Sequence, residues 1–295
     1  MTDFGKVMTA MVTPFKDDLS VDYKKAEELA VHLANNGSDS VVVHGTTGES
    51  PTLTHEEEYE LYRVVKSALK GTSCKVIAGT GSNSTATTIN STKQAEKIGC
   101  DGAMIVVPYY NRPSQEGLYQ HFKAVAQNTS LPLIIYNIPG RTGINLLPET
   151  TARIAEIKNY AGLKDAAGNL DQTSATVACC PKRFKIWSGD DSLTLPMLSV
   201  GAIGVISVAS HIAGKEIAQM VNAYHSGDTK KAMELHLKLL LLFKVLFITS
   251  NPTPLKAALA MVGRPVGIPR LPLIEANEKE KEQIRVVLKD LGLIK

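Results

Sequence analysis

The sequence predicts an α/β protein, a (β/α)8 TIM barrel followed by a C-terminal helical extension. Eight short runs of β-branched or apolar residues recur along the first 210 residues, and helical patterns separate them. Most runs are continuously apolar, as in strands that are covered on both faces. Regular alternation without a linker between two halves favours a closed barrel over an open doubly wound sheet. The eight runs are residues 7–9, 41–43, 76–78, 104–107, 133–136, 162–164, 184–187 and 204–208.

The helices between these strands have recognisable start and stop signals. Residues 22–35 carry apolar side chains at helical spacing, and Gly37 follows as a stop. Thr54 with Glu57 predicts a capping box at the start of another helix. Pro148 suits the first turn of a later helix, because its missing N–H is not needed there.

From about Gly227 onward the pattern predicts helices only. We therefore divide the chain into residues 1–226, a barrel with its active site at the C-terminal ends of the strands, and residues 227–295, a helical extension. The most apolar window is residues 237–248, which Lys238 and Lys244 interrupt. It is too short to cross a bilayer, so we expect a buried helix.

Composition excludes several classes of protein. The 295 residues carry a net charge of only +3, spread along the chain, which argues against a nucleic-acid partner or a polybasic membrane patch. The N-terminus lacks the basic and apolar regions of a signal peptide, so we expect a cytoplasmic protein. Four cysteines without CxxC spacing indicate reduced thiols: Cys74, Cys100, Cys179 and Cys180.

Polar residues follow five of the predicted strands. In a barrel the C-terminal ends of the strands face one active site, so these residues should meet. They bring together an amine, phenols, hydroxyls and a guanidinium, without His, Asp or Glu at metal-ligand spacing, which disfavours a metal-dependent aldolase. The segments are residues 45–50 (GTTGES), 108–111 (PYYN), 136–142 (YNIPGRT), 164–165 (KD) and 188–191 (SGDD).

Lys164 is the candidate nucleophile of this set. Burial in a barrel mouth lowers the pKa of a lysine, and the neutral amine can condense with a ketone to form an imine. Tyr136 on the adjacent strand can shuttle a proton, and the hydroxyls and amides around Thr46 and Thr47 can hold a carboxylate. Each residue alone has an ordinary explanation, such as a surface lysine or a core tyrosine. The prediction rests on the set.

The chain resembles the dihydrodipicolinate synthase family, within the N-acetylneuraminate lyase superfamily. The resemblance covers nearly the whole chain, and its motifs together are highly specific. It implies a lyase that condenses pyruvate with L-aspartate-4-semialdehyde to 4-hydroxy-tetrahydrodipicolinate, in lysine and diaminopimelate biosynthesis. The matching segments are residues 9–15, 45–50, 107–111, 136–142, 204–208 and 251–256.

The resemblance also implies a role for each site residue. Lys164 forms the imine with pyruvate, so no cofactor or metal is expected. Tyr136, Thr46 and Tyr110 form a proton relay, in which Tyr110 reaches into the site of a neighbouring subunit. The family's usual assembly is a tetramer built from tight dimers.

Four further residues are assigned to substrate binding by the resemblance. Thr47, together with Thr46, holds the carboxylate of pyruvate. Arg141 binds the carboxylate of aspartate-4-semialdehyde. The backbone around Gly189 and Ile206 lines the pocket.

Many members of the family are inhibited by L-lysine at a site between subunits. Two matching positions differ here: Glu58 replaces a His, and Thr87 replaces a Glu that pairs with the effector's ammonium groups. We therefore expect weak or absent inhibition, because a charge-assisted contact is lost. Alternatively, Glu58 and Thr87 are solvated helix residues and no effector site exists. The positions that are kept are Ser50, His55, Asn83 and Tyr109.

One departure from the family lies beside the nucleophile, and two other functions compete. Asp165 and Ala167 stand where the family commonly has Glu and Ser or Thr. The chain could instead be another pyruvate aldolase, such as N-acetylneuraminate lyase or a keto-deoxy-sugar-acid aldolase, but those lack the continuation that contains Arg141. A non-catalytic barrel that senses keto acids is disfavoured by the intact Lys164, Tyr136 and Tyr110.

Overall fold

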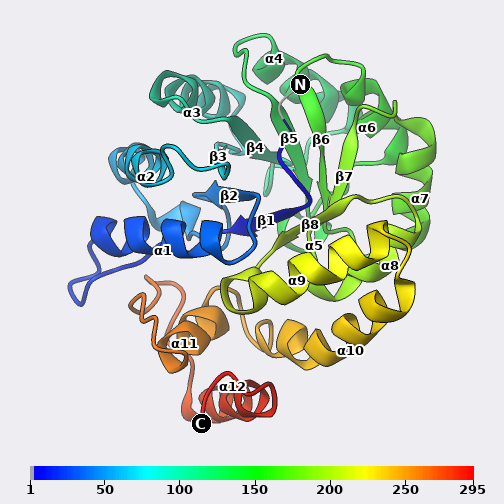
Figure 1. Cartoon of the computed structure of the whole chain (residues 1–295). Coiled ribbons are helices and arrows are strands. Elements are labelled where there is room, and N and C mark those ends of the chain that lie inside the picture. Colours follow the sequence, from blue (N-terminus) through cyan, green and yellow to red (C-terminus); the bar gives the residue numbers. More distant parts are fainter. Residues whose placement is uncertain (1–2) are drawn as a thin grey trace.

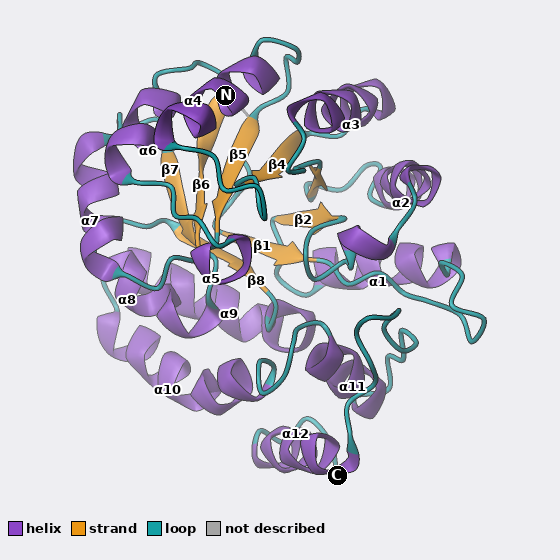
Figure 2. Cartoon of the chain, turned by 180° about the vertical axis from the view of Figure 1, so that it is seen from behind, coloured by secondary structure: helices purple, strands orange, loops and turns teal. Residues whose placement is uncertain are grey.

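Eight parallel strands form a closed barrel in the computed structural model, which describes residues 3–295. Each strand pairs with the next along the chain, and β8 closes the barrel on β1, where Met8 lies opposite Ile206. Figure 2 shows the strands at the centre of a ring of helices. All eight predicted strands are confirmed. They are β1 (Val7–Ala10), β2 (Ser40–Val43), β3 (Lys75–Gly79), β4 (Gly102–Val106), β5 (Leu133–Asn137), β6 (Tyr160–Asp165), β7 (Lys185–Ser188) and β8 (Gly204–Ser207).

The helices of the ring start and stop where their capping residues predict. Thr54 and Glu57 form the capping box of α2, and Pro148 is the first residue of α6. Gly37, just beyond the end of α1, has a φ of 90°, which glycine adopts without strain. The helices are α1 (Tyr23–Asn35), α2 (His55–Ala68), α3 (Thr85–Ile98), α4 (Gln115–Ala126), the short α5 (Pro139–Thr142), α6 (Pro148–Ala155), α7 (Leu170–Cys179), α8 (Thr194–Ser199) and α9 (Ser210–His225).

Two layers of apolar side chains hold the barrel together. One layer fills the barrel interior and includes Met8, Ile77 and Trp187. The other lies between the strands and the surrounding helices. Successive residues of a strand point to opposite faces, and here both faces are buried. This explains why the strands are continuously apolar in the sequence.

Three further helices follow the ring: α10 (Thr229–Val245), α11 (Thr253–Met261) and α12 (Glu278–Asp290). Figure 1 shows α11 and α12 below the barrel, outside the ring, where α12 packs against α10 and α11. A boundary between residues 226 and 227 stays a prediction. Within residues 3–295, no helix is both long enough and apolar enough to cross a membrane.

The prediction that residues 237–248 form a buried helix is wrong for one face. Leu239 and Leu242 are buried, but Leu237 is 58% exposed and Leu241 is also exposed. Phe247, beyond the end of α10, is exposed as well. An apolar run that covers all sides of a helix does not reveal which sides have packing partners. α10 packs against α9 and α12 and leaves Leu237 and Leu241 exposed.

Candidate active site

Lys164 and Tyr136 meet at the C-terminal end of the barrel. They lie opposite each other in the pairing of β5 with β6. The Lys164 Nζ lies 4.2 Å from the centroid of the Tyr136 ring, and both side chains are buried. No hydrogen bond or ion pair joins this ammonium group to another side chain within residues 3–295. The neighbouring strands therefore place an amine against a phenol and leave the amine free to react.

Burial sets the protonation of both groups. Desolvation lowers the pKa of Lys164 to about 8, with Asp191 opposing this shift and Arg141 adding to it. Desolvation raises the pKa of Tyr136 to about 12, and Arg141 and the Thr46 hydroxyl act in the other direction. Near neutral pH the site therefore holds a fraction of neutral amine beside a protonated phenol. This is the pair of states that imine formation with proton transfer needs.

The GTTGES segment forms a tight turn after β2. Thr46 is half-buried and Thr47 is buried. The Thr13 hydroxyl donates a hydrogen bond of 2.6 Å to the Gly48 carbonyl, and Glu49 is held at a φ of 57°. A cavity of about 30 Å³, lined in part by Tyr136 and Thr46, is large enough to hold a water molecule.

Gly189 leaves space for the nucleophile. A Cβ at this position would lie 2.8 Å from the Cβ of Ala166 and 3.2 Å from two carbons of the Lys164 side chain. Any other residue would therefore press on Lys164. Ile206, on β8, is buried in the interior layer of the barrel.

The two remaining predicted site residues are exposed. Arg141 lies on α5, directly after β5, and its charge affects the pKa of both Lys164 and Tyr136. Tyr110 is 89% exposed, with a φ of 71° that a tyrosine rarely adopts. Within this one chain Tyr110 does not complete the site, so its role in a partner subunit stays a prediction.

Asp165, which stands beside the nucleophile where the family commonly has Glu, has hydrogen-bond donors for its carboxylate. The Asp165 carboxylate accepts hydrogen bonds from the Ala167 backbone N–H at 3.0 Å and from the Thr173 hydroxyl at 2.7 Å. Burial raises the pKa of Asp165, and these two donors act against the shift. The shorter acid is thus a structural group behind Lys164.

Three of the four predicted effector residues line one cavity of about 110 Å³: Ser50, His55 and Tyr109. Glu58 and Thr87 line it too. Asn83 is absent from this lining, and its backbone carbonyl instead accepts a hydrogen bond from the Asn111 side chain.

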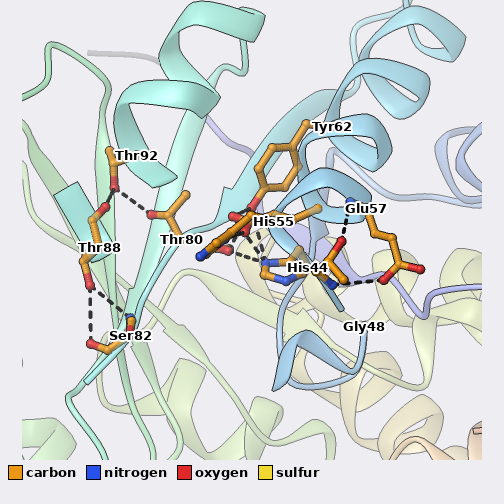
Figure 3. A network of polar contacts seen from close by, with 12 residues as sticks. His44, Gly48, His55, Glu57, Tyr62, Thr80, Ser82, Thr88 and Thr92 are labelled. Carbon is orange, nitrogen blue, oxygen red and sulfur yellow. Dashed lines mark hydrogen bonds and ion pairs between the residues drawn. The ribbon is translucent and has the colours of Figure 1, made fainter. Parts of the chain in front are cut away.

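Glu58 is not a solvated helix residue, so that part of the alternative is wrong. It is 2% exposed, and its carboxylate contacts His55 Nδ1 at 2.9 Å and accepts a hydrogen bond from Tyr62 at 2.9 Å. Figure 3 shows His44, His55 and Tyr62 close together, and the hydrogen bond between the Thr80 and Thr92 hydroxyls on a neighbouring part of the chain.

Sequence reasoning missed two buried polar residues near the site. Asn251, which lies in the segment before α11, donates a hydrogen bond to the Thr47 hydroxyl. Lys256, on α11, forms a buried ion pair with Glu49. Their only signal was the NPTPLK segment, which marked the resemblance without indicating a contact. The described chain contains no group of three or more His, Cys, Asp or Glu side chains that could hold a metal ion.

Comparison with known proteins decides the family. The sequence profile of the Dihydrodipicolinate synthetase family matches residues 3–291. The chain belongs to this family. The protein of Thermosynechococcus vestitus named 4-hydroxy-tetrahydrodipicolinate synthase is 56% identical over 100% of both chains. The one of Moorella thermoacetica, with the same name, is 56% identical over 99% of both chains.

Solved structures of the family have the same fold. Dihydrodipicolinate synthase from Cyanidioschyzon merolae, determined with lysine bound, is 51% identical, with a TM-score of 0.97 over 99% of both chains. The enzyme from Aquifex aeolicus is 44% identical, with a TM-score of 0.95 over 98% of this chain and 99% of the other. These likenesses confirm both the family resemblance and the TIM barrel.

Proposed function

We propose that this protein is a lyase that condenses pyruvate with L-aspartate-4-semialdehyde to give 4-hydroxy-tetrahydrodipicolinate, in lysine and diaminopimelate biosynthesis. The observation that carries the proposal is the buried amine of Lys164, which has no ionic partner among residues 3–295 and lies against the Tyr136 phenol. Relatives that are 56% identical over their whole length and carry the name of this activity support it.

The chemistry follows from a neutral amine. Lys164 attacks the ketone carbon of pyruvate, and loss of water gives a protonated imine that acts as an electron sink. Loss of a methyl proton gives the enamine, whose carbon attacks the aldehyde. The amino group of the second substrate then closes the ring on the imine carbon and releases Lys164. In this scheme Tyr136 and Thr46 move protons between these steps, and no metal or cofactor is required.

Two carboxylates need recognition in this reaction. Thr46 and Thr47, at the turn after β2, are proposed to hold the carboxylate of pyruvate. Arg141 is proposed to bind that of the aldehyde, because a guanidinium can pair with a carboxylate through two parallel hydrogen bonds. Gly189 and Ile206 are proposed to line the pocket with their backbone.

We also propose a cytoplasmic homotetramer built from tight dimers, with Tyr110 entering the partner's site to complete the proton relay. The exposure and strained backbone of Tyr110 support this, since a tyrosine held outward in this way suits a contact with another subunit.

At the effector cavity we propose weak or absent inhibition by L-lysine. Thr87 supplies no charge, and the Glu58 carboxylate is already occupied by His55 and Tyr62. Half-inhibition at sub-millimolar L-lysine in saturating pyruvate would contradict this proposal.

One assay separates the proposed reaction from its alternative. The purified protein should consume pyruvate only when aspartate-4-semialdehyde is also present, and it should not cleave N-acetylneuraminate. Cleavage of N-acetylneuraminate or of a keto-deoxy-sugar acid, with no reaction of the aldehyde, would instead favour the other pyruvate aldolases. A protein that binds pyruvate without any turnover would favour a sensor.

A further inference from the structure

The segment between α10 and the start of α12 reaches the turn that carries Thr46 and Thr47. Asn251 and Lys256 come from this segment, and both are buried against residues 45–50. These contacts join positions about 200 residues apart in the chain. The C-terminal extension therefore does more than cover the outside of the barrel.

The contact between Asn251 and Thr47 has a direction. The Asn251 Nδ2 donates to the Thr47 Oγ1 at 2.8 Å, and both side chains are buried. Because the hydroxyl oxygen accepts this bond, its own proton remains available to donate to another group. No second hydrogen bond of the Thr47 hydroxyl is found within the described part of the chain. An anion bound at the turn would accept a hydrogen bond from the Thr47 hydroxyl.

The ion pair beside this contact fixes the backbone of the turn. The Lys256 Nζ lies 2.7 Å from the Glu49 Oε1, and it also donates to the Ile268 carbonyl at 3.1 Å. The other carboxylate oxygen of Glu49 accepts the Arg270 backbone N–H at 2.8 Å. Glu49 has a left-handed φ, which a non-glycine residue keeps only when its surroundings impose it. The extension thus holds the turn at both Thr47 and Glu49.

We propose that Asn251 is a positioning residue for substrate binding: its amide orients the Thr47 hydroxyl as a donor to the carboxylate of pyruvate, while the Lys256–Glu49 ion pair keeps the turn in place. This inference rests on the proposed function, because it takes pyruvate as the occupant of the site.

The test measures the pyruvate concentration that gives half-maximal borohydride trapping, together with the KM for each substrate and kcat. Asn251→Ala should raise the half-maximal concentration and the pyruvate KM roughly tenfold, with little change in the aldehyde KM. Asn251→Asp, which has nearly the same shape, should have a larger effect. Its carboxylate would accept a hydrogen bond from the Thr47 hydroxyl and would repel the carboxylate of pyruvate. Asn277→Ala removes the capping residue of α12 and serves as the matched control, which should leave both values unchanged.

A further comparison separates positioning from general stability. In a Thr47→Val background the Asn251→Ala change should add little to the pyruvate KM, because the hydroxyl that it orients is gone. A wild-type pyruvate KM in Asn251→Asp, or equal and additive effects in both backgrounds, would overturn the inference. If the unmodified protein trapped no pyruvate at all, the proposed function would be wrong instead.

Discussion

Two lysines are almost equally buried in this molecule, yet their surroundings differ. Lys164 is 5% exposed in the barrel mouth, and Lys256 is 3% exposed between α11 and the turn after β2. Each ammonium group lies about as far from an aromatic ring, 4.2 Å from Tyr136 and 4.1 Å from Phe15. Burial lowers the pKa of each to about 8.

The difference lies in their partners. Lys256 pairs with Glu49 and donates to a carbonyl, whereas the Lys164 ammonium group lies over the Tyr136 ring and has no hydrogen bond or ion pair within residues 3–295. A lowered pKa therefore does not by itself identify a nucleophile. A buried amine can react when no anion holds it and a substrate can reach it, and the four predictions below test this distinction.

The largest expected effect is on catalysis. Lys164→Ala should lower kcat by roughly a thousandfold or more, because no other described amine lies in the barrel mouth in the same position. Lys256→Met should stay within about tenfold of the unmodified protein while it is folded. Steady-state kinetics at 25 °C measure both, with circular dichroism as the control for folding. A similar loss of kcat in the two variants would show that the different surroundings of Lys164 and Lys256 do not give them different roles in catalysis.

The same two positions should differ in stability, with opposite signs. Lys256→Met leaves the Glu49 carboxylate buried without its cation and should reduce the free energy of unfolding by about 3–5 kcal/mol. Lys164→Met removes a buried ammonium group that has no anionic partner within residues 3–295, so it should raise the free energy of unfolding. Urea unfolding at one fixed protein concentration measures both changes. A destabilised Lys164→Met protein would contradict the assignment.

The stability gain of Lys164→Met should depend on pH in a defined direction. The folded-state pKa lies below the unfolded value, so burial of the ammonium group opposes folding fully below about pH 8 and no longer does so above about 10.5. The gain should therefore shrink between these two values. In kinetics, kcat/KM for pyruvate should rise about tenfold per pH unit below about 8 and then level off. If Lys256→Met shifted the pH at which kcat/KM levels off, the pKa of Lys256 rather than that of Lys164 would control the pH dependence.

The smallest expected effect concerns the arginine near the nucleophile. Arg141 contributes to the lowered pKa of Lys164, so in Arg141→Ala the kcat/KM for pyruvate should level off at a higher pH. The same variant should still trap pyruvate but should respond poorly to aspartate-4-semialdehyde. Arg270→Ala is the matched control, because Arg270 acts on Lys256 in the same sense. An unchanged pH dependence and unchanged aldehyde kinetics in Arg141→Ala would remove Arg141 from the site.

The barrel and the centre of the site could be predicted from the sequence because both depend on local order. Apolar runs located the strands, and adjacent strands of a barrel place Tyr136 beside Lys164. The contacts of Asn251 and Lys256 could not be predicted, since they join segments about 200 residues apart and no periodic pattern encodes them. The exposed face of residues 237–248 was missed for a related reason: an apolar side chain does not specify its packing partner.

Borohydride trapping with pyruvate, followed by peptide mapping, tests the central claim most directly. The account predicts that one reduced pyruvyl group is attached to Lys164 and none to Lys256, although burial lowers the pKa of both lysines to about 8. The adduct should be absent in Lys164→Ala. An adduct that persists in that variant, or that maps to Lys256, would contradict the account.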